Sequence, residues 1–147
     1  MKKIIECVST FFYLGNAPYV PGTVGSLGAL GLYFLFKNNF CLYTILLIVV
    51  TILGYVTAGQ AEKIFRQKDS SRIVIDEAAG LLLAFWGMRL NIILVAAGFL
   101  IFRVLDIVKV YPADRMEKLK GSRGIMGDDL VCGLYTNIIL QILTRIM

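Results

Sequence analysis

The stretch NNFCLYTILLIVVTILGYVTAGQA occupies residues 38–61 and contains 24 residues without one charged side chain. An α-helix rises about 1.5 Å per residue, so this stretch is longer than the roughly 30 Å hydrocarbon core of a bilayer. The wider composition agrees, because A, V, I, L, M, F, W, Y and C make up 58% of the 147 residues, which is high for a water-soluble domain. The sequence therefore predicts a membrane-spanning helix at residues 38–61.

Shorter apolar segments flank this stretch on both sides. They are two uncharged runs of 15 residues each, 22–36 and 130–144, and two apolar runs of 11 and 13 residues, 78–88 and 90–102. Arg89 separates the last two runs. These two runs form either one helix with an arginine near its middle or a hairpin that turns at residues 87–91.

The distribution of positive charge decides between these alternatives. With the hairpin, residues 1–21, 62–77 and 103–129 share one side of the membrane. That side then carries twelve of the 15 Lys and Arg residues: Lys2, Lys3, Lys63, Arg66, Lys68, Arg72, Arg103, Lys109, Arg115, Lys118, Lys120 and Arg123. The opposite side carries the other three, which are Lys37, Arg89 and Arg145. Lys and Arg accumulate on the cytoplasmic side of membrane proteins, so we expect the rich side to be cytoplasmic. A single helix would export six of the twelve and would leave Arg89 in hydrocarbon at a cost of about 2.5–3.5 kcal/mol.

The sequence as a whole predicts an all-α fold. We expect a small polytopic helical membrane protein with about four to five membrane-embedded helices and a single domain over residues 1–147. Residues 4–14 are compatible with an N-terminal helix that lies in the interface of the cytoplasmic leaflet. Glu6 interrupts the apolar stretch after Lys2 and Lys3, and no A-x-A cleavage site follows, so we expect the N-terminus to be retained.

The composition excludes several kinds of chemistry. The sequence has no His, which removes His-based acid–base catalysis and His metal ligands, and its three Cys are too scattered for a disulfide framework or a zinc site. The net charge of +5 is not concentrated in a basic tract with interleaved aromatic residues, so no nucleic acid partner is expected. All ten carboxylates fall in the segments assigned to the cytoplasmic side: Glu6, Glu62, Asp69, Asp76, Glu77, Asp106, Asp114, Glu117, Asp128 and Asp129.

One candidate site element is rich in glycine. Residues 18–26, PYVPGTVGS, lead directly into an apolar segment. Backbone N–H groups at a helix start, together with the Thr23 and Ser26 hydroxyls, could bind a phosphate. Glycine at every third position from Gly22 to Gly31 would equally let another helix approach closely, and both interpretations can hold.

Acidic residues supply the other candidate elements. They are Asp76 and Glu77 at the start of one apolar helix, Asp128 and Asp129 at the start of the last, and Asp106 between Arg103 and Lys109 on one helix face. Helix capping and a structural Arg103–Asp106 ion pair are alternative interpretations. Carboxylates that converge without His or Cys suit Mg²⁺, which prefers oxygen ligands. A bound Mg²⁺ could bridge a phosphate oxygen and lower the pKa of a water that attacks phosphorus.

Four segments carry a resemblance to a known family. VPGTVGSLGAL (20–30), IDEAAG (75–80), FRVLDIVK (102–109) and GIMGDDLVCGLY (124–135) closely resemble, in the same order, the signatures of phosphatidylglycerophosphatase A. The resemblance implies a Mg²⁺-dependent membrane enzyme of bacteria. Together with the distribution of positive charge, it leads us to expect the cytoplasmic (inner) membrane and an active site that faces the cytoplasm. Its substrate would be phosphatidylglycerophosphate, whose terminal phosphate is removed to give phosphatidylglycerol and inorganic phosphate.

The resemblance also implies roles for particular residues. At the matching positions we expect catalytic groups at Asp76, Glu77, Asp106, Asp128 and Asp129, and phosphate-binding groups at Gly22, Thr23, Gly25, Ser26, Arg103 and Lys109. Our hypothesis is that Asp76, Asp106 and Asp129 supply most of the Mg²⁺ ligands, with Glu77 or Asp128 as the base or as support for the ligands. The chain departs from the family pattern at Val110, where a proline is usual, and at Ser122, where a glycine is usual. No role is given to Glu117.

Two alternative functions remain open at this stage. One is a phosphatase for another lipid phosphomonoester such as phosphatidic acid. The other is a small non-enzymatic membrane carrier or subunit whose carboxylates line an ion path, although such a protein would be expected to place charges in both halves of the membrane. The sequence does not indicate an oligomeric state.

Overall fold

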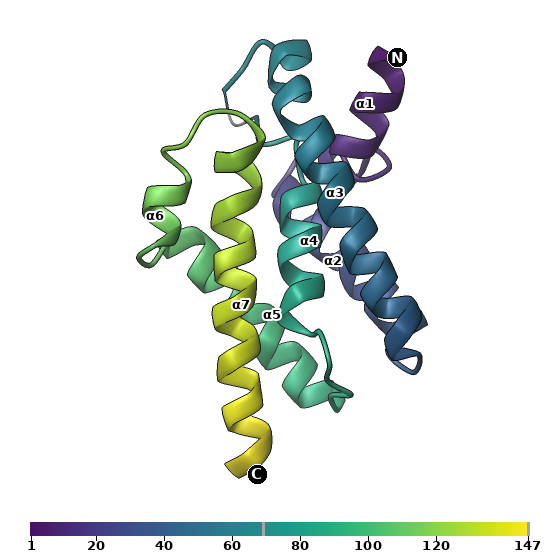
Figure 1. Cartoon of the computed structure of the whole chain (residues 1–147), viewed down its shortest axis with the longest axis vertical. Coiled ribbons are helices and arrows are strands. Elements are labelled where there is room, and N and C mark those ends of the chain that lie inside the picture. The colour runs from purple at the N-terminus through teal and green to yellow at the C-terminus, as the bar shows by residue number, and fades with distance from the viewer. Residues whose placement is uncertain (69, 147) are drawn as a thin grey trace.

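The structure is a computed structural model that describes residues 1–68 and 70–146 (Figure 1). The described residues form helices and no strands. In chain order the elements are α1 (Lys2–Ser9), a 3₁₀ turn (Leu14–Asn16), α2 (Pro21–Phe36), α3 (Phe40–Phe65), α4 (Ile75–Ala84), α5 (Ile92–Val108), α6 (Ala113–Met116) and α7 (Ser122–Ile146). The all-α prediction for a small helical membrane protein is confirmed.

Two helices are long and apolar enough to cross a membrane. They are α3, with 26 residues, and α7, with 25 residues, while α2 is a shorter apolar helix. Asn39 sets the start of α3 because its side-chain oxygen accepts a hydrogen bond from the Leu42 N–H at 3.1 Å. Ile45, Ile48 and Ile52 are each more than half exposed on α3, so this helix presents apolar side chains outward, as a lipid-facing helix does.

The predicted hairpin is present as α4 and α5. Residues 85–91 connect the two helices, and Gly87 in this connection has a φ of +78°, a conformation that glycine adopts without strain. The first helix ends at Ala84 rather than at Met88. The Asn137 side-chain amide on α7 donates hydrogen bonds of 3.0–3.1 Å to the carbonyl groups of Leu83, Ala84 and Trp86, which satisfies this early helix end.

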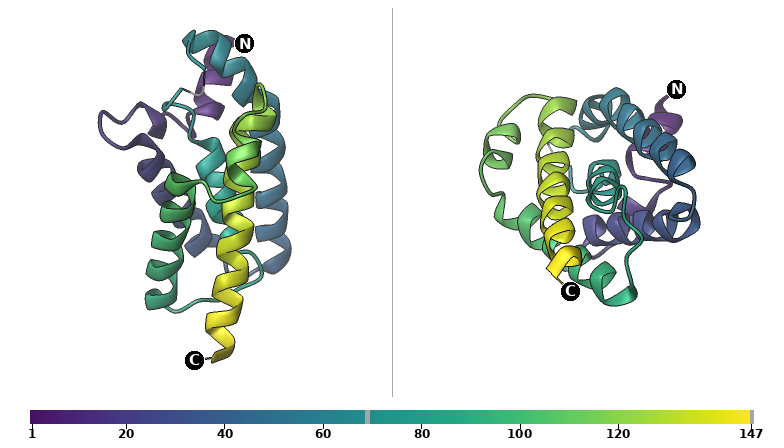
Figure 2. Two further views of the ribbon diagram at one scale, coloured as in Figure 1. Left: turned by 90° about the vertical axis from the view of Figure 1, so that its left-hand side faces the viewer. Right: turned by 60° about the horizontal axis from the view of Figure 1, so that its bottom comes forward.

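The short helix α4 occupies the centre of the molecule. It packs against α2, α3, α5 and α7, and these helices surround it in the right-hand view of Figure 2. The contact with α7 is made by two glycines: a Cβ on Gly133 would collide with the Gly80 carbonyl, and a Cβ on Gly80 would lie 2.6 Å from the Asp129 carbonyl oxygen. At ten residues, or about 15 Å, α4 is too short to cross a bilayer.

The connections fall at the two ends as the charge pattern predicted. The N-terminus, the α3–α4 connection and the α6–α7 connection lie at one end of the molecule (Figure 1). The α2–α3 connection, the α4–α5 connection and the C-terminus lie at the other. At that other end, Arg89 donates a hydrogen bond of 3.2 Å to the Asn38 carbonyl, which joins the two connections.

The N-terminal helix is shorter than predicted. It ends at Ser9 and not at residue 14, because Phe11, Phe12 and Tyr13 all have positive φ angles of 47–66°. The Thr10 hydroxyl supports this irregular turn: it donates to the Glu6 carbonyl at 2.8 Å and accepts from the Tyr13 N–H at 3.0 Å. Helix α1 packs against α3, and its position in a lipid interface stays a prediction.

The glycine contact between α4 and α7 leads to a stability prediction. Gly80→Ala places a methyl group against the Asp129 carbonyl and the Phe102 ring, where there is no room for it. We expect the free energy of unfolding to fall by about 1–3 kcal/mol. Thermal unfolding of the purified protein in detergent measures this change.

Gly31→Ala is the matched control, because a Cβ at Gly31 meets no atom within 4 Å. Alanine is the better helix former, so this variant should unfold at or slightly above the wild-type temperature. Equal unfolding temperatures for the two variants would contradict the close α4–α7 contact.

Candidate active site

The first two acidic residues of the site stand on the first turn of α4. The helix begins here because Ile73, Val74 and Ile75 are buried apolar residues that anchor the chain, and the Val74 N–H donates to the Ser9 carbonyl at 3.1 Å. Asp76 and Glu77 follow directly, at the positive end of the helix dipole, which favours negative charge. Asp76 is 7% exposed.

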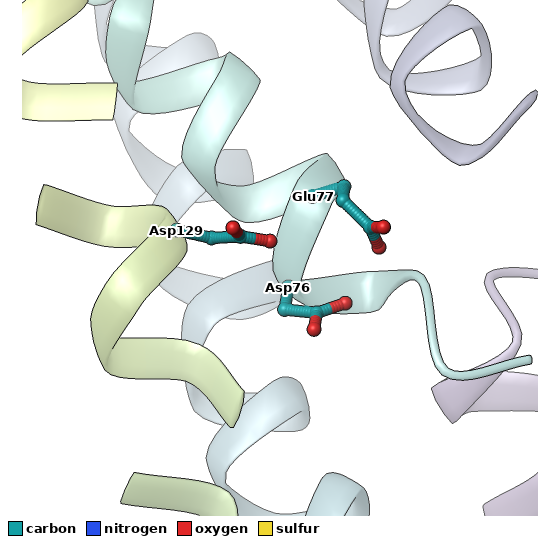
Figure 3. A group of neighbouring side chains, drawn as sticks. All are labelled: Asp76, Glu77 and Asp129. Carbon is teal, nitrogen blue, oxygen red and sulfur yellow. The ribbon is translucent and has the colours of Figure 1, made fainter. Parts of the chain in front are cut away.

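Helix α7 brings the second acidic pair to the same place. Asp128 and Asp129 are 5% and 3% exposed and lie about two turns inside α7, roughly 10 Å from its first residue. The close contact at Gly80 draws this part of α7 against α4. Figure 3 shows the Asp129 carboxylate from α7 pointing toward α4, close to Asp76 and Glu77.

These acids form a tight group. One carboxylate oxygen from each of Asp76, Glu77 and Asp129 lies within 4.8 Å of the others. The group opens into a cavity of about 210 Å³ whose described lining is Ser70, Ser71, Ile73, Asp76, Glu77, Asp106, Lys109, Asp128 and Asp129. The structure therefore brings together all five acidic residues and the lysine that the sequence nominated.

Two cations are held by these acids. The Lys109 ammonium lies 2.7 Å from Asp128 Oδ2 and 3.0 Å from Glu117 Oε1. The Arg103 guanidinium lies beside the cavity, 2.7 Å from Asp106 Oδ2 and 4.0 Å from Glu77 Oε1. The ion pair between Arg103 and Asp106, one of the alternatives from the sequence, is thus present.

Burial and charge shift the proton affinities of the site. Burial would lower the pKa of Lys109, but its hydrogen bonds to Asp128 and Glu117 and their negative charge raise that pKa above its ordinary value. Burial raises the pKa of Glu77 to about 7. Burial and then the charge of Glu77 raise the pKa of Asp76 well above its ordinary value. Lys109 is therefore a permanent cation, whereas the buried acids need a further positive charge to stay ionised together.

Two buried oxygens of the acidic group have no hydrogen-bond partner in the described part of the chain. They are Asp76 Oδ1 and Glu77 Oε2. A buried carboxylate oxygen without a partner is costly, and a divalent cation would remove that cost. The residues present therefore fit a hard cation with oxygen ligands such as Mg²⁺.

The geometry refines the expected ligand set. Asp76 and Asp129, both nominated from the sequence, belong to the tight group, and Glu77 is its third member. Asp106 lines the same cavity but is already held by Arg103. The candidate ligand set from the geometry is therefore Asp76, Glu77 and Asp129, whereas the hypothesis from the sequence has Asp106 as the third ligand.

The Gly-rich start of α2 lies next to the acidic group. A Cβ on Gly22 would collide with Glu77 Oε1 and lie 3.4 Å from an Arg103 nitrogen, whereas a Cβ on Gly25 would lie 2.6 Å from Val74. The Ser26 hydroxyl is buried and donates to the Gly22 carbonyl at 2.9 Å, and Thr23 is half-buried on the first turn. The close-approach interpretation of the glycines therefore holds at Gly22 and Gly25, and a role in phosphate binding stays a prediction.

Three polar residues of the site were not found from the sequence. Ser70 and Ser71 line the cavity, and Glu117 pairs with Lys109. Polar residues in a connecting segment are common, so nothing in their spacing marked them.

Comparison with known proteins agrees with the geometry. The family model described as Phosphatidylglycerophosphatase A matches residues 7–144. The proteins named phosphatidylglycerophosphatase A of Escherichia coli and Haemophilus influenzae are 35% and 30% identical, covering 88% and 95% of this chain and 77% and 91% of their own lengths. A Bacteroides thetaiotaomicron protein with the provisional name phosphatidylinositol-3-phosphatase is 35% identical, covering 92% of this chain and 90% of its own length.

No solved structure matches the chain. The family match spans nearly the whole sequence and includes every acidic residue of the cavity. The chain belongs to the phosphatidylglycerophosphatase A family.

Proposed function

We propose that the protein hydrolyses the terminal phosphate monoester of phosphatidylglycerophosphate, with Mg²⁺, to give phosphatidylglycerol and inorganic phosphate. Family membership indicates the reaction. The observation that supports the metal is the group of three carboxylates, two of which have a buried oxygen without a hydrogen-bond partner among the described residues.

The charged residues of the site each have a part in this proposal. Asp76, Glu77 and Asp129 hold Mg²⁺, which when bound polarises a phosphate oxygen and lowers the pKa of a water molecule. Lys109 supplies a positive charge to the phosphate, and Asp128 keeps its ammonium group in place through the 2.7 Å contact. Arg103 holds Asp106 beside the tight group.

The depth of the site suits a lipid substrate. The acidic group lies about 10 Å inside α7 from its first residue, below the connections at that end of the molecule. A phospholipid in the adjacent leaflet can then keep its acyl chains in hydrocarbon while its phosphate reaches the cavity.

The metal proposal predicts a strict dependence on divalent cation. Chelation should abolish phosphate release from phosphatidylglycerophosphate, and added Mg²⁺ should restore it. Asp76→Asn, Glu77→Gln and Asp129→Asn each remove one charged ligand. Loss of a residue that only supports a metal ligand costs about 10- to 100-fold in activity, so we expect turnover to fall by at least that factor. Glu77→Gln should also raise the Mg²⁺ concentration for half-maximal turnover more than Asp106→Asn does.

Asp114→Asn is the control for these substitutions, because Asp114 lies on α6 and pairs with Lys118 at 3.8 Å. It should keep wild-type turnover and Mg²⁺ dependence. Undiminished turnover in chelator would exclude the metal mechanism, and a larger effect of Asp106→Asn would return Asp106 to the ligand set.

A second substrate class has specific support. The Bacteroides relative, which is provisionally named phosphatidylinositol-3-phosphatase, is as similar to this chain as the E. coli relative, at 35% identity each. A panel of phosphatidylglycerophosphate, phosphatidylinositol 3-phosphate and phosphatidic acid separates these activities. We expect kcat/KM to be highest for phosphatidylglycerophosphate. A higher value for either other lipid would reassign the substrate, and transport without any hydrolysis would favour the carrier alternative.

We also propose that the cavity faces the cytoplasm in the bacterial inner membrane. The three segments that carry twelve of the 15 Lys and Arg residues include the connections at the cavity end. In a chain whose three cysteines are replaced by alanine, a membrane-impermeant thiol reagent should label Asn38→Cys but not Lys120→Cys in intact spheroplasts. After detergent is added, both cysteines should be labelled. Labelling of Lys120→Cys but not Asn38→Cys in intact spheroplasts would show that the cavity faces away from the cytoplasm.

A further inference from the structure

We propose that Ser70 is a substrate-binding residue whose hydroxyl donates a hydrogen bond to a non-bridging oxygen of the phosphate monoester. This inference rests on the proposed phosphatase function and adds a residue that the family motifs quoted above do not contain. It includes no covalent step, because Ser70 only donates a hydrogen bond.

The position of the Ser70 side chain is the first observation. Ser70 is 2% exposed, yet it lines the same cavity as the acidic group. Its Oγ has no hydrogen-bond partner among the described residues. A buried hydroxyl without a partner lowers stability unless a ligand or water satisfies it, so this group is available to whatever fills the cavity.

The charge of the cavity is the second observation. Its described lining carries five carboxyl groups and one ammonium group. When the acids are ionised, they can only accept hydrogen bonds, and a phosphate monoester also only accepts. The side-chain donors that line the cavity are therefore Lys109, Ser70 and Ser71, as far as the described residues go.

Among these donors, Ser70 is the one that is buried and makes no hydrogen bond to another described residue. Lys109 already contacts Asp128 and Glu117, so its ammonium group has one N–H left for a substrate. Ser71 is exposed and its hydroxyl can turn to solvent. A neutral donor also suits this cavity, because a second cation would pair with the carboxylates and compete with a bound metal for them.

The backbone holds Ser70 in place. Its carbonyl accepts a hydrogen bond from the Ile73 N–H at 2.8 Å, which closes a turn directly before α4. Arg72 ties the same turn to the N-terminal segment through Asn16 Oδ1, at 2.9 and 2.8 Å, and through Glu6 at 3.2 Å. A donor fixed in this way loses little entropy when the substrate binds.

The test compares Ser70→Ala with Thr144→Ala, which removes an exposed hydroxyl near the C-terminus, in the purified full-length protein with Mg²⁺. A hydrogen bond to a charged group corresponds to about 10- to 100-fold in affinity, so Ser70→Ala should raise the KM for phosphatidylglycerophosphate by about that factor. Calorimetry with inorganic phosphate should show the same loss without turnover. The Mg²⁺ concentration for half-maximal turnover should not change, and Thr144→Ala should stay close to wild type in both measurements.

Thermal unfolding separates binding from a structural role. Ser70→Ala removes a hydroxyl that has no hydrogen-bond partner in the described part of the chain, so the unfolding temperature of this variant should equal or exceed that of the wild type. Wild-type phosphate affinity in Ser70→Ala, or a lower unfolding temperature, would overturn the inference. A third result is phosphate binding that depends on Ser70 in a protein that does not hydrolyse any of the lipids. This result would refute the proposed function, while Ser70 would remain a phosphate-binding residue.

Discussion

The contact between α4 and α7 controls the geometry on which the site depends. A ten-residue helix cannot cross the bilayer, so α4 must be buried among longer helices, and Gly80 and Gly133 let its backbone touch that of α7. This close approach sets the distance between the first turn of α4 and Asp129. Any larger residue at either glycine would separate the three carboxylates whose oxygens lie within 4.8 Å of one another, so in the proposed function packing and metal binding share one constraint.

The same contact creates an electrostatic problem that the cavity must solve. Asp76, Asp128 and Asp129 are each less than a tenth exposed, and burial raises the pKa of Asp76 and Glu77. Lys109 and Arg103 neutralise part of this charge through Asp128 and Asp106. The tight group of Asp76, Glu77 and Asp129 is where the proposed divalent cation would bind. Asp128 and Asp106 make the two short ion pairs, at 2.7 Å each, whereas Glu77 lies 4.0 Å from Arg103.

The sequence predicted the parts of the fold that depend on hydrophobicity and charge. The 38–61 span, the hairpin around Arg89 and the grouping of segments at two ends all follow from the cost of burying charge in lipid. It did not predict the end of α1 at Ser9, since three successive positive φ angles leave no pattern in residues 11–13. The acids of the site were found because they lie beside apolar runs of the sequence, although Asp128 and Asp129 lie about two turns inside α7 and not at its start as predicted. Ser70 and Glu117 lie in connections where polar residues are expected anyway.

Phosphate is an anion, and most of the groups that line this cavity are anions too. A phosphate monoester can enter only if positive charge and hydrogen-bond donors outweigh that repulsion at short range. Lys109 supplies one cation, and a bound Mg²⁺ would supply a second, held by Asp76, Glu77 and Asp129. Ser70 adds a donor that carries no charge. On this view the metal has a binding role as well as a chemical one, because without it the acids that position the reaction would repel the substrate.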